Sequence, residues 1–162
     1  MLRISKLADY GTVVMTYMAG SPQRVLSAQE IALAVGLELP TVSKILKMLA
    51  RKKLLLSLRG VKGGYLLAKP AEDISIAEII DALESRPSGL TECSSATGLC
   101  RHESVCAVRS NWQRISKMVH EALQDIRLTE LSRPPEHILE THIEAGAVHR
   151  RTRDLHPAST ER

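Results

Sequence analysis

Three cysteines occur within a short stretch of the chain, at Cys93, Cys100 and Cys106. An odd number of cysteines does not close a disulfide framework, so thiolate ligation and free thiols are the remaining interpretations. Thiolates are soft ligands that select zinc, copper(I) or iron–sulfur clusters. The spacing lacks the paired cysteines of structural zinc sites and also differs from ferredoxin runs. Spacing alone therefore leaves open both metal binding and buried cysteines without a metal.

A four-ligand metal site would need one group besides the three thiols. Nearby candidates are Glu92, His102 and Glu103, and Asp9 is available from a distant part of the chain. Carboxylates and imidazoles both ligate transition metals, so residue chemistry alone does not choose among them.

Basic side chains form the second chemical feature. Residues 1–70 carry 11 Lys and Arg against 3 Asp and Glu, whereas residues 71–162 carry 11 against 15. Such an asymmetry is typical of a polyanion-binding half, although a solvated basic face also produces it. The chain has one Trp, three Tyr and no Phe, too few for the stacking platforms that bind single strands. Double-stranded DNA is therefore the favoured partner.

The elements that would position these basic groups are readable from capping and periodicity. Ser5 can cap a helix that extends to about Ala19, and the capping box of residues 27–30 opens a second helix ending at Gly36. Pro40 suits the first turn of a third helix, to about Lys52. Two short helices joined by a glycine-containing turn predict a helix-turn-helix.

A β-hairpin should follow directly. Residues 54–58 can form one strand, residues 59–64 a basic glycine-rich turn, and residues 65–67 the returning strand. The predicted fold class is mainly α with a small β-hairpin wing, and the winged helix-turn-helix DNA-binding domain spans residues 1–70.

DNA recognition needs small polar or bidentate groups at base edges and positive charge at phosphates. The outer face of the third helix supplies both near its N-terminus, the end that enters the major groove, and the wing adds backbone or minor-groove contacts. The predicted DNA-binding residues are Thr41, Ser43, Lys44, Lys47, Arg59 and Lys62.

The remainder divides into three predicted regions. Residues 71–102 form a linking helix, opened by the capping box of Ser75 and Glu78, followed by the cysteine loop. The region 103–132 contains one long helix over about residues 103–131, which suits either a core helix or a coiled-coil-like dimer seam. Its apolar stripe at three-four spacing consists of Val105, Val108, Trp112, Ile115, Val119, Ala122 and Ile126. A helix of that size would be about 43 Å long, so we favour dimerisation. Residues 133–162 hold few large apolar side chains and are expected to be disordered.

Other function classes find little support in the sequence. An apolar run long enough to cross a bilayer and a secretory signal are both missing, which favours a cytoplasmic protein. We find no hydrolytic or transferase constellation, and therefore expect a protein that is not an enzyme.

Taken together, these features resemble the Rrf2 family of winged-helix regulators over about residues 1–131. The resemblance rests on the opening MLRISKLADY, on ILKML before the wing, on RGVKGGYLL in the wing, and on three cysteines before a long helix. It implies a homodimer that holds one iron–sulfur cluster per subunit, 2Fe–2S or 4Fe–4S, on three cysteines and binds palindromic promoter DNA. Thr41, Ser43 and Lys44 match base-facing positions of the family, and Arg59 matches a wing arginine.

The chain departs from the family pattern at the fourth ligand. IscR-type members place a histidine three residues after the last cysteine, where this chain has Arg109, which cannot ligate. In some NsrR-type members an aspartate on the first helix of the other subunit completes the site, and Asp9 matches that position. His102 is the main rival. Pro40 stands where relatives carry a serine, so the preferred operator can differ.

The resulting expectation is a cluster-responsive repressor of iron–sulfur cluster assembly genes. A nitric-oxide-responsive repressor with the same site is the closest alternative. A winged-helix DNA binder with structural zinc or free thiols is the main rival without a cluster.

Overall fold

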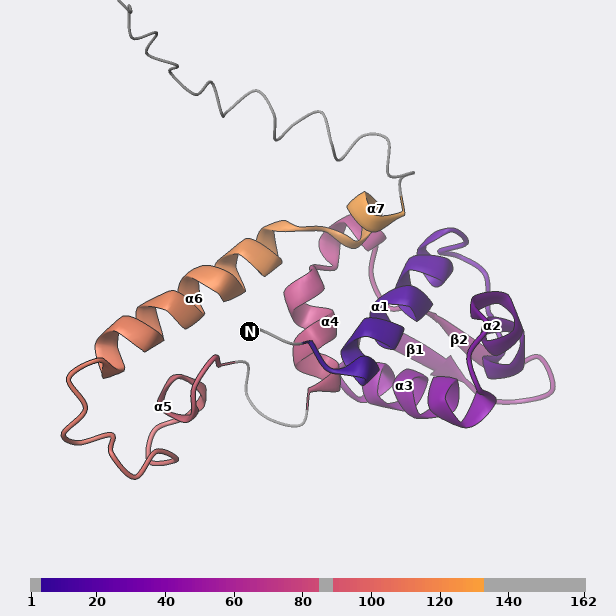
Figure 1. The fold of residues 1–162 in the computed structure, drawn as a ribbon. Coiled ribbons are helices and arrows are strands. Elements are labelled where there is room, and N and C mark those ends of the chain that lie inside the picture. Colours follow the sequence, from indigo (N-terminus) through magenta and orange to yellow (C-terminus); the bar gives the residue numbers. More distant parts are fainter. Residues whose placement is uncertain (1–3, 85–88, 133–162) are drawn as a thin grey trace, which may run out of the picture. The chain divides into compact units, whose positions relative to one another are not determined.

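The computed structural model describes residues 4–84 and 89–132 (Figure 1). Helices alternate with one pair of strands, and a short 3-10 helix, η1 (Ala71–Asp73), joins the strands to the following helix. The elements are α1 (Lys6–Ala19), α2 (Ala28–Val35), α3 (Leu39–Arg51), β1 (Leu55–Leu58), β2 (Gly64–Leu67), α4 (Ile76–Leu83), α5 (Glu92–Ser95), α6 (Arg109–Asp125) and α7 (Leu128–Leu131).

The predicted helix starts and stops are present in the first half of the chain. The Ser5 side chain accepts a hydrogen bond from the Ala8 N–H, and Ser27 does the same for Glu30. Gly36 ends α2 in the left-handed region at φ 67°, which favours glycine. One detail differs, because the Glu30 carboxylate pairs with Arg24 rather than completing the capping box.

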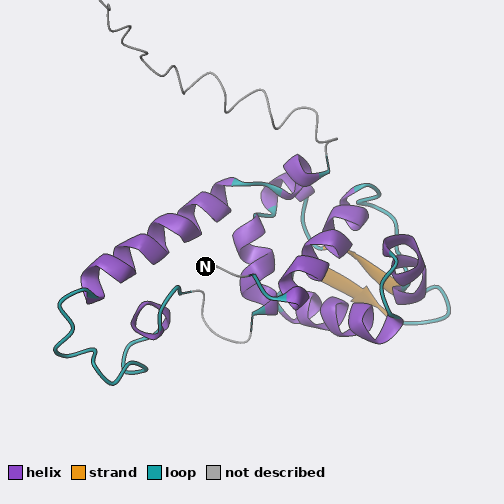
Figure 2. Cartoon of the chain, viewed as in Figure 1, coloured by secondary structure: helices purple, strands orange, loops and turns teal. Residues whose placement is uncertain are grey.

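The wing is a two-stranded antiparallel hairpin (Figure 2). Its register pairs Leu55 with Leu67 and Leu58 with Gly64. The hairpin also joins the segment before α2, because Leu26 and Tyr65 exchange backbone hydrogen bonds of 2.9 and 2.8 Å. The predicted fold class, a mainly helical winged helix-turn-helix, is confirmed.

One hydrophobic core joins these elements. Each of α1, α3 and α4 contributes fully buried side chains, among them Met15, Ile45 and Leu83. Helices α1 and α4 approach closely at Gly11, where an added Cβ would lie 2.0 Å from Leu83 Cδ1. The large apolar residues of α4, at positions 76, 79, 80 and 83, are all buried.

The prediction of a single long helix over residues 103–131 is wrong at both ends. Residues 101–105 form turns and α6 begins only at Arg109, after Val108, whose side chain makes no capping hydrogen bond. Helix α6 ends at Asp125 because the next residues pair with the strand-like segment before α4. Ile76 donates to the Ile126 carbonyl oxygen at 3.0 Å, and Leu128 donates to that of Ile74 at 2.9 Å. This pairing places Leu128 in the core at 0% exposure and starts α7.

Other sequence expectations remain predictions. The boundaries proposed for the DNA-binding, linking and dimerisation regions stay predictions, and the proposed disordered tail, residues 133–162, lies outside the described residues. Within residues 4–84 and 89–132, the helices are all too short or too polar to cross a membrane.

Candidate DNA-binding surface and cysteine loop

Helix α3 is anchored by one apolar face and presents the opposite face to solvent. Val42, Ile45, Leu46 and Leu49 are all fully buried. The opposite face holds the predicted DNA-contacting residues of this helix, with Lys44 and Lys47 exposed and Thr41 and Ser43 half-buried. This arrangement is the one expected for a recognition helix, with small polar groups near the N-terminus and lysines along the flank.

The wing tip carries the other predicted basic contacts. Arg59 and Lys62 are both exposed, on the turn between β1 and β2. Gly60 adopts φ 112°, a conformation that L side chains rarely take. The next two glycines of the motif allow close backbone approaches, because a Cβ on Gly63 would lie 2.4 Å from the Leu58 carbonyl oxygen. Steric constraints in the turn therefore explain why these positions are glycine.

We predict that Gly64→Ala displaces the wing. A Cβ there would lie 2.5 Å from the Leu26 carbonyl oxygen, which accepts the Tyr65 N–H, so the backbone must shift. We expect DNA affinity to fall about tenfold while the helical circular dichroism is retained, because the clash lies outside the helical core. Gly20→Ala is a suitable control, since its contact is milder, at 3.3 Å. Wild-type affinity in Gly64→Ala would contradict a wing held by this contact.

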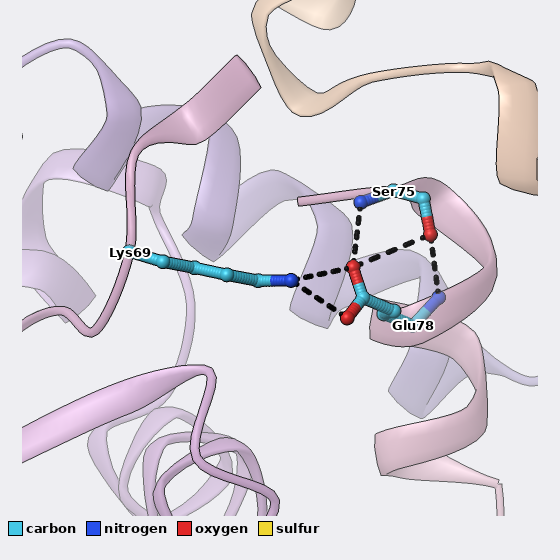
Figure 3. A network of polar contacts seen from close by, with 3 residues as sticks. All are labelled: Lys69, Ser75 and Glu78. Atoms are coloured by element: carbon cyan, nitrogen blue, oxygen red, sulfur yellow. Dashed lines mark hydrogen bonds and ion pairs between the residues drawn. The ribbon is translucent and has the colours of Figure 1, made fainter. Parts of the chain in front are cut away.

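A polar network ties the end of the wing to the start of α4 (Figure 3). Lys69 Nζ lies 2.7 and 3.0 Å from the two carboxylate oxygens of Glu78. The same carboxylate accepts the Ser75 N–H at 3.0 Å, while the Ser75 hydroxyl accepts the Glu78 N–H at 3.2 Å. The predicted capping box is thus present and is extended by a lysine that follows β2.

The pKa of Glu78 is set by opposing effects. Burial alone would raise this pKa, but hydrogen bonds from Lys69 and Ser75, together with the Lys69 charge, hold it below its usual range. Because the pKa is lowered on folding, the ionised carboxylate stabilises the fold above the unfolded pKa. That stabilisation is lost as the pH falls through the folded pKa.

Glu78→Gln should therefore reduce the acid sensitivity of folding. We expect the wild type to lose up to about 1 kcal/mol more unfolding free energy than Glu78→Gln between pH 6 and about pH 3.5, a small effect because the carboxylate is partly screened by solvent. Urea unfolding at the two pH values measures the difference. Glu72→Gln, at an exposed glutamate of η1, is the control and should follow the wild type. Identical pH dependence in all three proteins would contradict the assignment.

The three cysteines lie in different surroundings. Cys93 is buried in α5 at 7% exposure, with its Sγ 3.3 Å from the Thr91 hydroxyl oxygen. Cys100 and Cys106 are half-buried in the turns before α6, and all three thiols are free. In the described part of the chain, no three or more His, Cys, Asp or Glu side chains come together closely enough to hold a metal ion. The three thiols share one loop but do not converge in this conformation.

The loop also contains an ion pair and a buried donor without a partner. Glu103 accepts the Gly98 N–H and lies 2.6 Å from Arg109 Nη2, so an ion pair spans the loop. Arg109 Nε is buried without a hydrogen-bond partner in the described structure, and the Arg109 N–H donates to the Cys106 carbonyl oxygen at 3.3 Å. Three thiols and a buried N–H without a partner are groups that a thiolate-bound cluster could use, but the thiols do not converge in this conformation.

The two predicted fourth ligands lie in different parts of the fold. Asp9 is exposed in the first turns of α1, on the outside of the helix. His102 is exposed in the turn between Cys100 and Glu103. Neither joins the cysteines in the described protomer, so both remain predictions.

Helix α6 exposes most of the apolar stripe that the sequence analysis singled out. Exposure is 80% for Val105, which lies just before the helix, 40% for Trp112, 41% for Ile115 and 37% for Ile126. Met118, which was not part of the predicted stripe, is 58% exposed. These side chains do not serve as the core of this protomer, contrary to the core-helix alternative.

Several long-range polar contacts were missed by sequence reasoning. Lys69 is nine positions from Glu78, and Ser116 of α6 lies far along the chain from the residues it bonds near α5. Such pairs have no local spacing rule, so only the packed fold brings them together.

The comparisons with known proteins decide the family. A family model described as "Iron-dependent Transcriptional regulator", the Rrf2 model, matches residues 4–134. The chain belongs to the Rrf2 family. The protein named rrf2 of Nitratidesulfovibrio vulgaris is 30% identical over 134 residues, which cover 82% of this chain and 88% of the relative. An HTH-type transcriptional regulator of Azotobacter vinelandii is 30% identical over 131 residues, 80% of this chain and 79% of the relative.

Solved structures of transcriptional regulators show the same fold. IscR of T. potens matches with a TM-score of 0.61 and 27% identity, over 80% of this chain and 85% of that one. CymR of B. subtilis, titled the global cysteine regulator, matches with a TM-score of 0.63 and 28% identity, over 82% and 97% of the two chains. This Rrf2 protein is therefore a DNA-binding transcriptional regulator and not an enzyme, as predicted. The chain matches the two structures about equally well, so the comparison does not distinguish which signal the protein responds to.

Proposed function

We propose that this protein is an iron–sulfur cluster-responsive repressor that binds promoter DNA as a homodimer. The observation that carries the proposal is the cysteine loop, which combines three free thiols with a buried, unused Arg109 donor in a member of an iron-dependent family. Cys93, Cys100 and Cys106 would hold the cluster, which supplies a link that oxidants or nitric oxide can break. Its target genes would be those of iron–sulfur cluster assembly, by analogy with the family.

The exposed apolar stripe supports a dimer. Side chains such as Trp112 and Ile115, about two-fifths exposed on one helix, gain stability when a second copy covers them. Two copies related by a two-fold axis would present two α3 helices, one to each half-site of a palindrome. In such a dimer Asp9 of the partner subunit could reach the cysteine loop and complete the ligand set.

The chain's own residues would then couple the cysteine loop to DNA. A ligand from α1 of one protomer and three thiols of the other would link the two DNA-binding domains. Loss of that link would let the separation between the two domains change. Operator half-sites lie about one helical turn apart, so a small change in separation lowers affinity. Ligation thus favours one of two dimer states.

Anaerobic reconstitution tests the cluster directly. We expect the wild type, supplied with iron and sulfide, to become coloured, and Cys93→Ala to stay colourless while remaining folded and dimeric. Asp9→Ala and His102→Ala identify the fourth ligand, because only the true ligand's loss should change the visible spectrum. A colourless wild type that binds zinc would instead support the structural-zinc alternative, and a colourless metal-free protein would support free thiols.

A further inference from the structure

Helix α6 is joined to the cysteine-bearing turn by a set of polar contacts. Of the α6 residues, all of which the structure describes, Ser116 alone is buried, at 8% exposure. Its hydroxyl accepts the Leu90 N–H at 2.8 Å and donates to the Ser94 hydroxyl at 2.9 Å. A buried serine within a helix is normally explained by such partners, because an unpaired hydroxyl there is costly.

A second contact reaches Cys93 itself. Gln113, one turn before Ser116, donates from its side-chain amide to the Cys93 carbonyl oxygen at 3.2 Å. The Ser94 hydroxyl in turn donates to the Thr91 carbonyl oxygen at 2.9 Å, and the Thr91 hydroxyl lies 3.3 Å from Cys93 Sγ. The short α5 turn is therefore held on α6 by side chains on both sides of Cys93.

We infer that Ser116 and Gln113 are positioning residues that dock the Cys93 turn on α6. The inference deepens the proposed function, since α6 also carries the proposed dimer face, but it concerns the thiol's position and not the cluster. Helix and turn should move as one unit, so a chemical change at Cys93 acts on the helix. Cys100 and Cys106, in the turns after α5, lie outside these contacts and serve as internal references.

Thiol alkylation of the full-length, metal-free protein tests the docking. A pulse of iodoacetamide followed by peptide mass spectrometry gives a separate rate for each cysteine. In the wild type we expect Cys93 to react more slowly than Cys106. Ser116→Ala removes both hydrogen bonds of the hydroxyl. It should raise the Cys93 rate at least about tenfold, since a single hydrogen bond is worth up to roughly that factor, and should leave the Cys106 rate unchanged. Alanine favours the helix more than serine, so α6 should persist.

Gln113→Glu provides an independent variant, because it keeps the side chain's shape and removes the donor to the carbonyl oxygen. Gln124→Glu, which places the same change on an exposed part of α6, is the matched control and should behave as the wild type. An unchanged Cys93 rate in both docking variants, or a wild-type Cys93 as reactive as Cys106, would overturn the inference. All of these rates are measured without metal, so failure to take up a cluster would sink the proposed function and leave this result standing.

Discussion

Ile115→Glu is expected to dissociate the proposed homodimer into monomers. Ile115 lies near the middle of the exposed stripe of α6 and is 41% exposed in one protomer. In a two-fold dimer the substitution would bury two carboxylates in an apolar interface, where unpaired charges are strongly unfavourable. Sedimentation or light scattering measures the mass. We also expect DNA affinity to fall about a hundredfold or more, because a monomer loses the gain from engaging two half-sites at once.

The control for this variant is again Gln124→Glu, which adds the same charge to an exposed position of α6 outside the stripe. It should remain dimeric and bind DNA normally. Helical circular dichroism of both variants shows that each is folded. A dimeric Ile115→Glu with wild-type DNA affinity would show that the stripe is not the dimer contact.

Replacing Lys44 and Lys47 together by glutamine should give the second large effect. Both lysines are exposed on α3, whose opposite face is anchored in the core. Lys47 is predicted to face phosphate, whereas Lys44 matches a base-facing position. If Lys47 neutralises one phosphate, the slope of log affinity against log salt should become shallower by about 1, since each phosphate contributes roughly 0.9. At low salt the affinity of the double variant should fall by one to two orders of magnitude, and the share due to Lys47 should be the same for every sequence tested, as expected for a lost phosphate contact. Fluorescence anisotropy at several salt concentrations measures both quantities.

Lys117→Gln is the matched control, because Lys117 carries the same charge on α6, with a side chain 76% exposed. Its removal should leave the salt slope unchanged. A slope equally altered in Lys117→Gln would indicate a general charge effect, and an unaltered slope in the α3 variant would exclude α3 as the phosphate-contacting surface. Substitutions of Thr41 and Ser43, which are predicted to face bases, should instead change sequence preference.

Local signals explain why so much of the fold was predictable. The Ser5 and Ser27 caps, the Gly36 stop and the Ser75–Glu78 capping box each act over a few residues, and the structure contains the hydrogen bonds expected of them except the return bond from Glu30. The wing motif was predictable for the same reason, since its glycines are required by the turn itself.

The features that the sequence did not reveal depend on contacts between residues far apart in the chain. The apolar spacing continues past Asp125, yet the helix ends there because Ile126 and Leu128 pair with residues near the start of α4. The docking of Cys93 through Ser116 and the clamp between Lys69 and Glu78 likewise depend on the packed fold. For the candidate site, cysteine types and spacing identified the loop but not a fourth ligand, because Asp9 and His102 are both exposed and neither joins the cysteines in the described protomer.

The most direct test of the account compares DNA binding by loaded and metal-free protein. A duplex selected by the protein from a random pool serves as the probe, and all steps are anaerobic. We predict that loading with iron and sulfide changes the affinity of the wild type at least about tenfold, the size of a typical coupling between two sites, and leaves Cys93→Ala unchanged. Equal affinity of the coloured and metal-free wild type would contradict cluster-responsive regulation, even if both bind the duplex tightly.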